Sequence, residues 1–264
     1  MTTVDTLRGG LLAFPLGGSA MSARRLELRL GAASQGAPGK ANEDFWAVVA
    51  PSDADSAGRG LVLALADGVS ATGSGWAAAQ SAVRSLTIDY YATPGHWSVG
   101  QSLDRLLRAA NEWLWAQHGR WRDQDSVVAA VSLLVLRDER YYLAHVGDTR
   151  VYRLRGNIFQ QLTTDHTWQR RDMRHVLRRA VGLDSHLVVD FADGDLEDGD
   201  TFLMATDGVW EVLGDPAMTE ILRHRLDEPE AAAVALVEAA QRHQAAYMGR
   251  NDATALVFCI RQST

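Results

Sequence analysis

The chain has 264 residues, of which 47% are hydrophobic and 22% are charged, values that are ordinary for a soluble globular protein. Its formal net charge of -7 argues against non-specific binding to nucleic acid, because such binding needs clustered positive charge. No apolar stretch reaches the length of a membrane span, so we expect no membrane association. The single cysteine, Cys259, excludes an internal disulfide and disfavours a zinc–thiolate site. It lies in an apolar run and is typical of a buried strand residue in a reducing compartment.

Residues 1–24 show poor periodicity and are rich in glycine and alanine. We interpret them as an irregular N-terminal extension, followed by one domain over residues 25–264. The apolar run at residues 11–16 is too short and too weakly flanked for a signal peptide, so we expect a cytoplasmic protein. We also expect a monomer.

Short apolar or alternating runs predict strands along the rest of the chain. These runs lie at residues 26–30, 45–50, 61–66, 127–136, 141–145, 151–154, 158–162, 201–205 and 255–260. Apolar residues at helical spacing predict helices over residues 75–91, 99–121 and 229–247. The turns at residues 51–60, 137–140 and 156–157 predict hairpins. Because strands and helices are grouped rather than alternated, the pattern predicts an α+β fold with antiparallel sheets covered by helices.

Acidic residues stand at the ends of several predicted strands: Glu43, Asp44, Asp67, Asp148, Asp207 and Asp252. Magnesium and manganese prefer carboxylate and carbonyl oxygens, and strand ends hold such groups at fixed separation. A glycine follows both Asp67 and Asp207, which lets the backbone approach closely and offers a carbonyl oxygen as a ligand. Two metals about 4 Å apart can bind a phosphate and activate a water for in-line attack. Each Asp-Gly alone is also a common turn, so the prediction depends on the combination.

The order of these motifs is the basis of a resemblance. The chain resembles the metal-dependent protein phosphatases of type 2C over residues 26–261. The matching segments are residues 42–44, 64–69, 146–152, 162–166, 179–182, 205–210 and 251–254. The resemblance implies a four-layer αββα sandwich, in which two antiparallel sheets are flanked by helices and the metals lie at one end. It also implies two Mn²⁺ or Mg²⁺ ions per site, with a weaker third ion.

The same resemblance implies a role for each acid. Asp67 would bridge both metals, Asp207 and Asp252 would complete one of them, and these three would be the catalytic residues. Glu43 and the carbonyl of Gly68 would serve the other metal. Asp44 would act through a water in the second shell, and Asp148 would join Asp207 at the third metal. The attacking water would be activated between the two metals.

The sequence departs from the family pattern at two functional positions. Val69 stands where some members have a histidine proposed as general acid, so we expect water to protonate the leaving serine. Lys40 stands near the place of the family's phosphate-binding arginine. We interpret Lys40 as a phosphate ligand, with a solvated loop lysine as the alternative, because a lysine lacks the two-pronged grip of arginine.

Other motifs have plainer interpretations. The glycines at positions 73 and 75 mimic a dinucleotide fingerprint, but Asp67 occupies the turn and no second βα unit follows. His145 and His166 are interpreted as structural residues. The acidic run at residues 193–200 predicts a solvated turn rather than a calcium loop. The tryptophans at positions 113, 115 and 121 are assigned to helix packing.

The predicted function is the hydrolysis of phosphoserine and phosphothreonine in other proteins; a catalytically silent module that binds a phosphoprotein or a kinase is the alternative. The segment at residues 89–114 looks like the phosphatase part of phosphatase–kinase fusions. The sequence contains no kinase signature, so a partner kinase would lie outside it. A general phosphatase without a dedicated partner is the other possibility.

Overall fold

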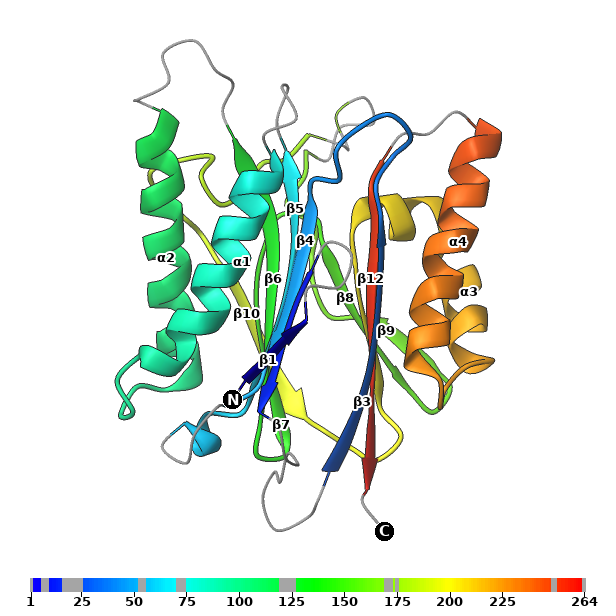
Figure 1. Ribbon diagram of the computed structural model, residues 1–264, viewed down its shortest axis with the longest axis horizontal. Helices are drawn as coiled ribbons and strands as arrows, with labels where there is room; N and C mark the ends of the chain where they lie inside the picture. Colours follow the sequence, from blue (N-terminus) through cyan, green and yellow to red (C-terminus); the bar gives the residue numbers. More distant parts are fainter. Residues whose placement is uncertain are drawn as a thin grey trace.

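The computed structural model describes residues 2–5, 10–15, 26–51, 56–69, 75–118, 127–168, 173, 176–247 and 251–262. Two β-sheets face each other, and helices cover their outer faces (Figure 1). Helices α1 (Gly75–Ala92) and α2 (Val99–His118) lie against one sheet. Helices α3 (Asp207–Arg223) and α4 (Pro229–Tyr247) lie against the other. The expected four layers of helix, sheet, sheet and helix are therefore confirmed.

Each sheet mixes strands from distant parts of the sequence. Within the described residues, the first sheet has the order β1 (Thr2–Asp5), β2 (Gly10–Pro15), β4 (Asp44–Val49), β5 (Leu61–Val69), β6 (Val128–Arg137), β7 (Arg140–Val146) and β10 (Asp190–Asp195). The second has the order β3 (Leu26–Gln35), β12 (Ala253–Gln262), β11 (Thr201–Ala205), β8 (Arg150–Arg155) and β9 (Ile158–Gln161). The pairing of β2 with β4 is parallel, and the pairings on either side of it are antiparallel.

The central strands read as continuous apolar runs because both of their faces are buried. Along β5, Val62, Ala64 and Ala66 pack with residues of α1 and α2. The alternate residues Leu61, Leu63 and Leu65 pack between the two sheets. The second sheet repeats this pattern, with Leu256 and Phe258 of β12 between the sheets and Val257 against α3 and α4. Period-two alternation therefore builds three apolar layers from two sheets.

Most predicted elements are present, and the hairpins β4–β5, β6–β7 and β8–β9 are antiparallel as expected. Cys259 is buried, as predicted. The predicted helix over residues 99–121 ends at His118 in the described part of the chain, and the tryptophan at position 121 lies outside it. Trp113 and Trp115 are only partly packed, since 51% and 42% of their surfaces are exposed. In the described residues, no helix is long and apolar enough to cross a membrane.

The interpretation of residues 1–24 as irregular was wrong for the parts that the structure describes. They contain strands β1 and β2, and β2 pairs with β4 so that Gly10 lies opposite Trp46. A Cβ on Gly10 would lie only 2.1 Å from the Trp46 indole. The short apolar run at residues 11–16 is thus largely a sheet strand, which Leu11 anchors in the core beneath the helices. The boundary between extension and domain stays a prediction.

Two further elements were not predicted. Helix α3 contains Gly208, Gly214 and Pro216, which sequence rules treat as helix breakers, and it is kinked where Gly214 adopts a φ of 68°. Strand β10 covers the start of the acidic run that was expected to be a solvated turn. Arg140 on the neighbouring strand pairs with the two acidic side chains Asp193 and Asp195, which makes an acidic edge strand tolerable.

Candidate active site

One end of the sandwich gathers the acidic residues singled out in the sequence. Asp44 begins β4 and lies directly opposite Asp67 of β5 in the strand register. Both occupy the positions that point between the sheets, because Trp46 and Leu65 do so farther along the same strands. β12 begins at the top of Figure 1 and directly follows Asp252. β11 leads into α3 at Asp207. Two sheets therefore each bring acids to one place.

Asp44 links the two sheets. One of its carboxylate oxygens, Oδ2, accepts hydrogen bonds from the hydroxyls of Thr206 (2.9 Å) and Thr254 (2.6 Å). The other, Oδ1, is buried without a hydrogen-bond partner among the described residues. Burial raises the pKa of Asp44 to about 7, and the neighbouring carboxylates of Asp252 and Glu43 add to the rise, although the threonine hydrogen bonds oppose it. A buried acceptor of this kind is typical of a site that holds a water or a cation.

The largest rises in carboxyl pKa at this end of the sandwich are those of Asp67 and Asp207. Loss of surrounding water raises the pKa of both carboxyls well above the ordinary value. The carboxylates of Asp44, Asp207, Asp148 and Asp252 raise that of Asp67 further. Converging like charges of this kind are stabilised by cations placed between them.

Asp252 and Glu43 are already oriented by main-chain amides. The N–H groups of Ala37 and Glu43 each donate to Asp252 at 2.7 Å, to different oxygens. The N–H of Gly75, the first residue of α1, donates to Oε1 of Glu43 at 2.6 Å. Among the residues that the structure describes, no three acidic, histidine or cysteine side chains form a closed metal-binding group. Each carboxylate oxygen has two lone pairs, so an amide bond leaves acceptor capacity for a cation.

Close backbone packing explains two glycines at this end. A Cβ on Gly68 would lie 2.1 Å from the carbonyl oxygen of Gly75, and one on Gly208 would lie 1.9 Å from that of Asp252. Only glycine permits these approaches, which bring the end of β5 at Asp67 and the start of α3 at Asp207 against their neighbours. The donor set of carboxylate and carbonyl oxygens, without thiolate, suits a hard cation such as Mg²⁺ or Mn²⁺.

The turn between β7 and β8 carries Asp148. Burial raises the pKa of its carboxyl to about 6, with further contributions from Asp165 and Glu211. Asp148 also raises the pKa of Asp207, which places the two carboxylates within electrostatic reach of each other. Glu211 acts on both of these acids as well, from one helical turn after Asp207. Glu211 was not among the predicted site residues, although its spacing of four residues from Asp207 on a helix would have indicated it.

A protein-family model described as Protein phosphatase 2C matches residues 33–249. The chain belongs to this family. Serine/threonine phosphatase stp of Listeria monocytogenes is 23% identical over 196 residues, which cover 67% of this chain and 78% of stp. Serine/threonine protein phosphatase PstP of Mycobacterium tuberculosis is 29% identical over 199 residues, which cover 69% of this chain and 37% of PstP. The chain is therefore a protein serine/threonine phosphatase of the 2C family.

Solved structures agree with this protein phosphatase 2C assignment. The catalytic domain of PstP in complex with two manganese ions matches with a TM-score of 0.73 and 26% identity, over 90% of this chain and 100% of that one. PppA, a key regulatory component of T6SS in Pseudomonas aeruginosa, matches with a TM-score of 0.74 and 26% identity, over 88% and 97% of the two chains. The family is metal-dependent, and one of its members holds two manganese ions in this fold.

The structure also bears on the predictions made for Lys40, for Val69 and for the glycines that precede and begin α1. Lys40 is exposed in a turn that starts at Ala37, whose amide binds Asp252, and its contact with phosphate stays a prediction. Val69 is 45% exposed and has no acidic or basic group to transfer a proton. The first amide of α1 meets the Glu43 carboxylate, which rules out the dinucleotide interpretation of its glycines, since a pyrophosphate would need that position.

The two histidines are structural in this protein phosphatase 2C fold, as expected. His145 is buried against the ring of His166, and its Nδ1 lies 3.0 Å from the hydroxyl of Ser132. His166 pairs with Asp190 through Nε2 at 3.0 Å. His166 contacts the turn that carries Asp148, because its Nδ1 accepts the N–H of Gly147, and His145 lies next to the His166 ring.

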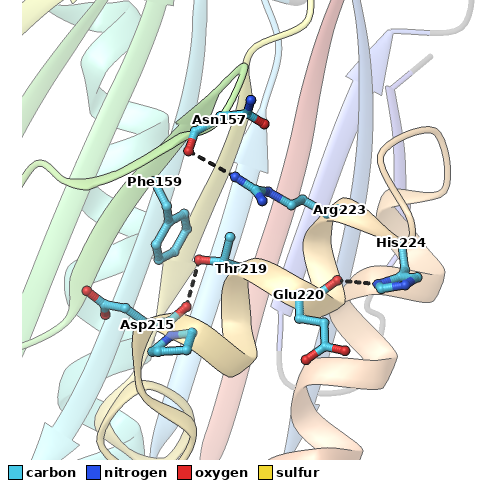
Figure 2. Close-up of a pocket in the computed structure, with 8 residues that line it drawn as sticks. Asn157, Phe159, Asp215, Thr219, Glu220, Arg223 and His224 are labelled. Carbon is cyan, nitrogen blue, oxygen red and sulfur yellow. Dashed lines mark hydrogen bonds between the residues drawn. The ribbon is translucent and has the colours of Figure 1, made fainter.

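A pocket of about 520 Å³ lies on the outer side of the second sheet, between the β8–β9 turn and α3 (Figure 2). Arg223 spans it by donating to the carbonyl of Asn157 at 2.9 Å, and the ring of Phe159 forms one wall. None of the acidic residues gathered at the end of the sandwich lines this pocket. The carboxylates, and not this concavity, mark the candidate site.

Proposed function

We propose that the chain hydrolyses phosphoserine and phosphothreonine in proteins with a water activated between two divalent cations. The observation that carries this proposal is the convergence of carboxylates from both sheets. Asp44 lies opposite Asp67 on the neighbouring strand, and its Oδ2 accepts hydrogen bonds from Thr206, which follows β11, and from Thr254 of β12. When bound, such cations neutralise phosphate oxygens and make a water acidic enough to attack.

Asp67 is the proposed bridge, because the neighbouring carboxylates act on it from both sheets. Asp207 and Asp252 would complete one cation site, and Glu43 with the carbonyl of Gly68 would form the other. The amides that hold Asp252 and Glu43 fix these carboxylates before any cation arrives. Such preorganisation lowers the cost of assembling the site.

Asp44 would act through a water. Its oxygen Oδ2 is used by two threonine hydroxyls, and its oxygen Oδ1 is the buried acceptor without a partner among the described residues. A water on Oδ1 would satisfy that atom and extend the network toward the cations.

Asp148 and Asp207 would hold a third, weaker cation. Glu211 adds negative charge beside both acids, which supports this placement. A position in a turn between two strands is consistent with weaker binding than at the primary pair.

Lys40 is proposed to balance the charge of the substrate phosphate. It sits three residues after Ala37, whose amide is fixed by Asp252, so its loop is tied to the site. The exposed side chain has the freedom to reach a bound phosphate as a point charge.

Turnover of p-nitrophenyl phosphate tests the activity. We expect hydrolysis with manganese and none after chelation, restored by adding manganese back. A protein that binds phosphopeptides but shows no turnover with either manganese or magnesium would instead be a silent regulatory module.

The partner is proposed to be a serine/threonine kinase, on the basis of the resemblance of residues 89–114 to phosphatase–kinase fusions. A kinase activated by its own phosphorylation stays active until the added charge is removed. The test compares dephosphorylation of autophosphorylated kinases from the same cell with that of unrelated phosphopeptides. Equal catalytic efficiency on all of them would reject a dedicated partner and leave the phosphatase activity standing.

A further inference from the structure

Trp210 of α3 holds the turn that carries Asp148. Its indole N–H donates to the main-chain carbonyl of Asp148 at 3.0 Å. Trp210 lies three residues after Asp207, on the first turn of the same helix. One helical turn therefore presents the carboxylate of Asp207 and also the donor that holds its acidic neighbour Asp148.

Arg150 fixes the plane of the indole. Its guanidinium lies 3.4 Å from the centroid of the Trp210 ring. The guanidinium is itself held by Asp165, with Nε at 2.9 Å from Oδ1 and Nη2 at 2.6 Å from Oδ2, and by the hydroxyl of Tyr152 at 3.0 Å. A two-pronged arginine–carboxylate pair resists rotation, so the stacked indole has little freedom to turn away from Asp148.

The opposite side of the turn is held by His166, the neighbour of Asp165. The N–H of Gly147 donates to Nδ1 of His166 at 3.1 Å, and the N–H of His166 donates to the carbonyl of Gly147 at 2.7 Å. Gly147 has a φ of 113°, a conformation that other residues rarely adopt. Residues 165 and 166 therefore hold the turn directly at Gly147 and, through Arg150 and Trp210, at Asp148.

This arrangement opposes a specific force. Asp148 and Asp207 repel each other when ionised, and Glu211 adds to the repulsion. A neutral indole that binds a main-chain carbonyl holds the turn whatever the charge of the carboxylate. The link also leaves both oxygens of the Asp148 carboxylate free of the indole.

We propose that Trp210 is a positioning residue that holds Asp148 beside Asp207 and thereby sets the affinity for the weaker cation. This inference rests on the proposed function, since it takes Asp148 as part of a cation site. A purely structural role is the competing explanation, because the Trp210 ring also packs against the core beneath α3 and α4. That role predicts lower stability without any selective change in cation binding.

Trp210→Phe separates the two explanations, because phenylalanine keeps a smaller aromatic ring for the core and for Arg150 but cannot donate a hydrogen bond to Asp148. Trp113→Phe is the matched control, since Trp113 is exposed on α2 and far along the chain from the site. Calorimetric titration of Mn²⁺ into metal-free protein should show unchanged tight binding in both variants. The weaker site of Trp210→Phe should bind about three- to tenfold less tightly, the range expected for one lost hydrogen bond.

Hydrogen exchange supplies a second measurement in the metal-free protein. The amides of residues 147–150 should exchange faster in Trp210→Phe than in the wild type and in Trp113→Phe, because the turn opens more often. Equal weak-site affinity and equal exchange would overturn the proposal. Loss of tight binding would overturn it as well, since Trp210 would then support the whole site.

These outcomes are distinguishable from failure of the proposed function. If the wild type binds no Mn²⁺ and hydrolyses no phosphate ester, the cation site itself is wrong. If the wild type binds Mn²⁺ and is active, but Trp210→Phe matches it in affinity and exchange, only the positioning role is rejected.

Discussion

Asp44 and Asp67 face each other directly across the hairpin of β4 and β5, at one end of the sandwich. Opposed like charges on neighbouring strands destabilise a sheet. The proposed cations remove that penalty when they bind. The arrangement therefore lowers the stability of the metal-free protein and favours cation binding.

The first prediction concerns Asp67→Asn. Removing one charge relieves the repulsion, so the metal-free variant should melt about 2 °C or more above the metal-free wild type. Activity should fall more than tenfold, which corresponds to about 1.4 kcal/mol of barrier. Calorimetric melting and a rate assay check both parts. Asp89→Asn on the outer face of α1 is the control and should change neither; a variant that keeps more than about a tenth of the rate would exclude the bridging role.

The second prediction separates binding from turnover at Asp148. Asp148→Ala should leave the two tight cations bound and should slow hydrolysis, because the weaker cation loses a carboxylate. Titration of manganese by calorimetry measures the stoichiometry. Loss of all tight binding would place Asp148 in the primary pair.

The third prediction concerns stability against pH. Burial, with His166 as the next contribution, lowers the pKa of His145 from 6.5 to about 4. Asp165 and Asp190 act in the opposite direction but are weaker. Above pH 6.5 the His145 side chain is neutral in both the folded and the unfolded protein. As the pH falls toward 4, His145 is protonated first in the unfolded chain, so the free energy of unfolding decreases. The loss reaches about 3 kcal/mol.

Denaturant unfolding of metal-free wild type and His145→Gln at several pH values tests this sign. The difference in unfolding free energy between the two proteins should shift in favour of the variant as pH falls from 6.5 to 4. A difference that stays constant with pH would show that His145 titrates normally in the folded protein.

The fourth prediction uses two glycines that differ in their surroundings. Gly208→Ala would press its Cβ against the carbonyl of Asp252, at 1.9 Å, so unfolding free energy should fall by about 1–3 kcal/mol. Activity should fall too, because Asp207 and Asp252 are forced apart. Gly95→Ala is the control, since no heavy atom lies within 4 Å of its Cβ position. Equal stability of the two variants would contradict the close packing at the site.

The acidic strand ends could be predicted because each combines a clear apolar run with an acid, as at Asp67 after residues 61–66. The continuous apolar runs arise because helices cover one face of each sheet and the other sheet covers the second face. The role of each acid was predicted from the order of the acids along the chain, which resembles that of the type 2C phosphatases.

The missed elements share a physical cause. Helix α3 survives Gly208 and Gly214 because tertiary packing on the second sheet outweighs local propensity. Strand β10 is an exposed edge whose acidic side chains Asp193 and Asp195 are compensated by Arg140, which lies 53 and 55 residues before them along the chain, so no local pattern reveals it. The bonds from Thr206 and Thr254 to Asp44 likewise depend on two sheets meeting, although hydroxyls beside Asp207 and Asp252 were a usable signal.

The most direct test of the central claim is phosphate release from a phosphothreonine peptide, measured in chelator and then during titration with manganese, for the wild type and Asp67→Asn. The account predicts no release in chelator, a rise to a plateau with manganese for the wild type, and almost no release from Asp67→Asn at any manganese concentration. Equal release by the wild type in chelator and in manganese would contradict it.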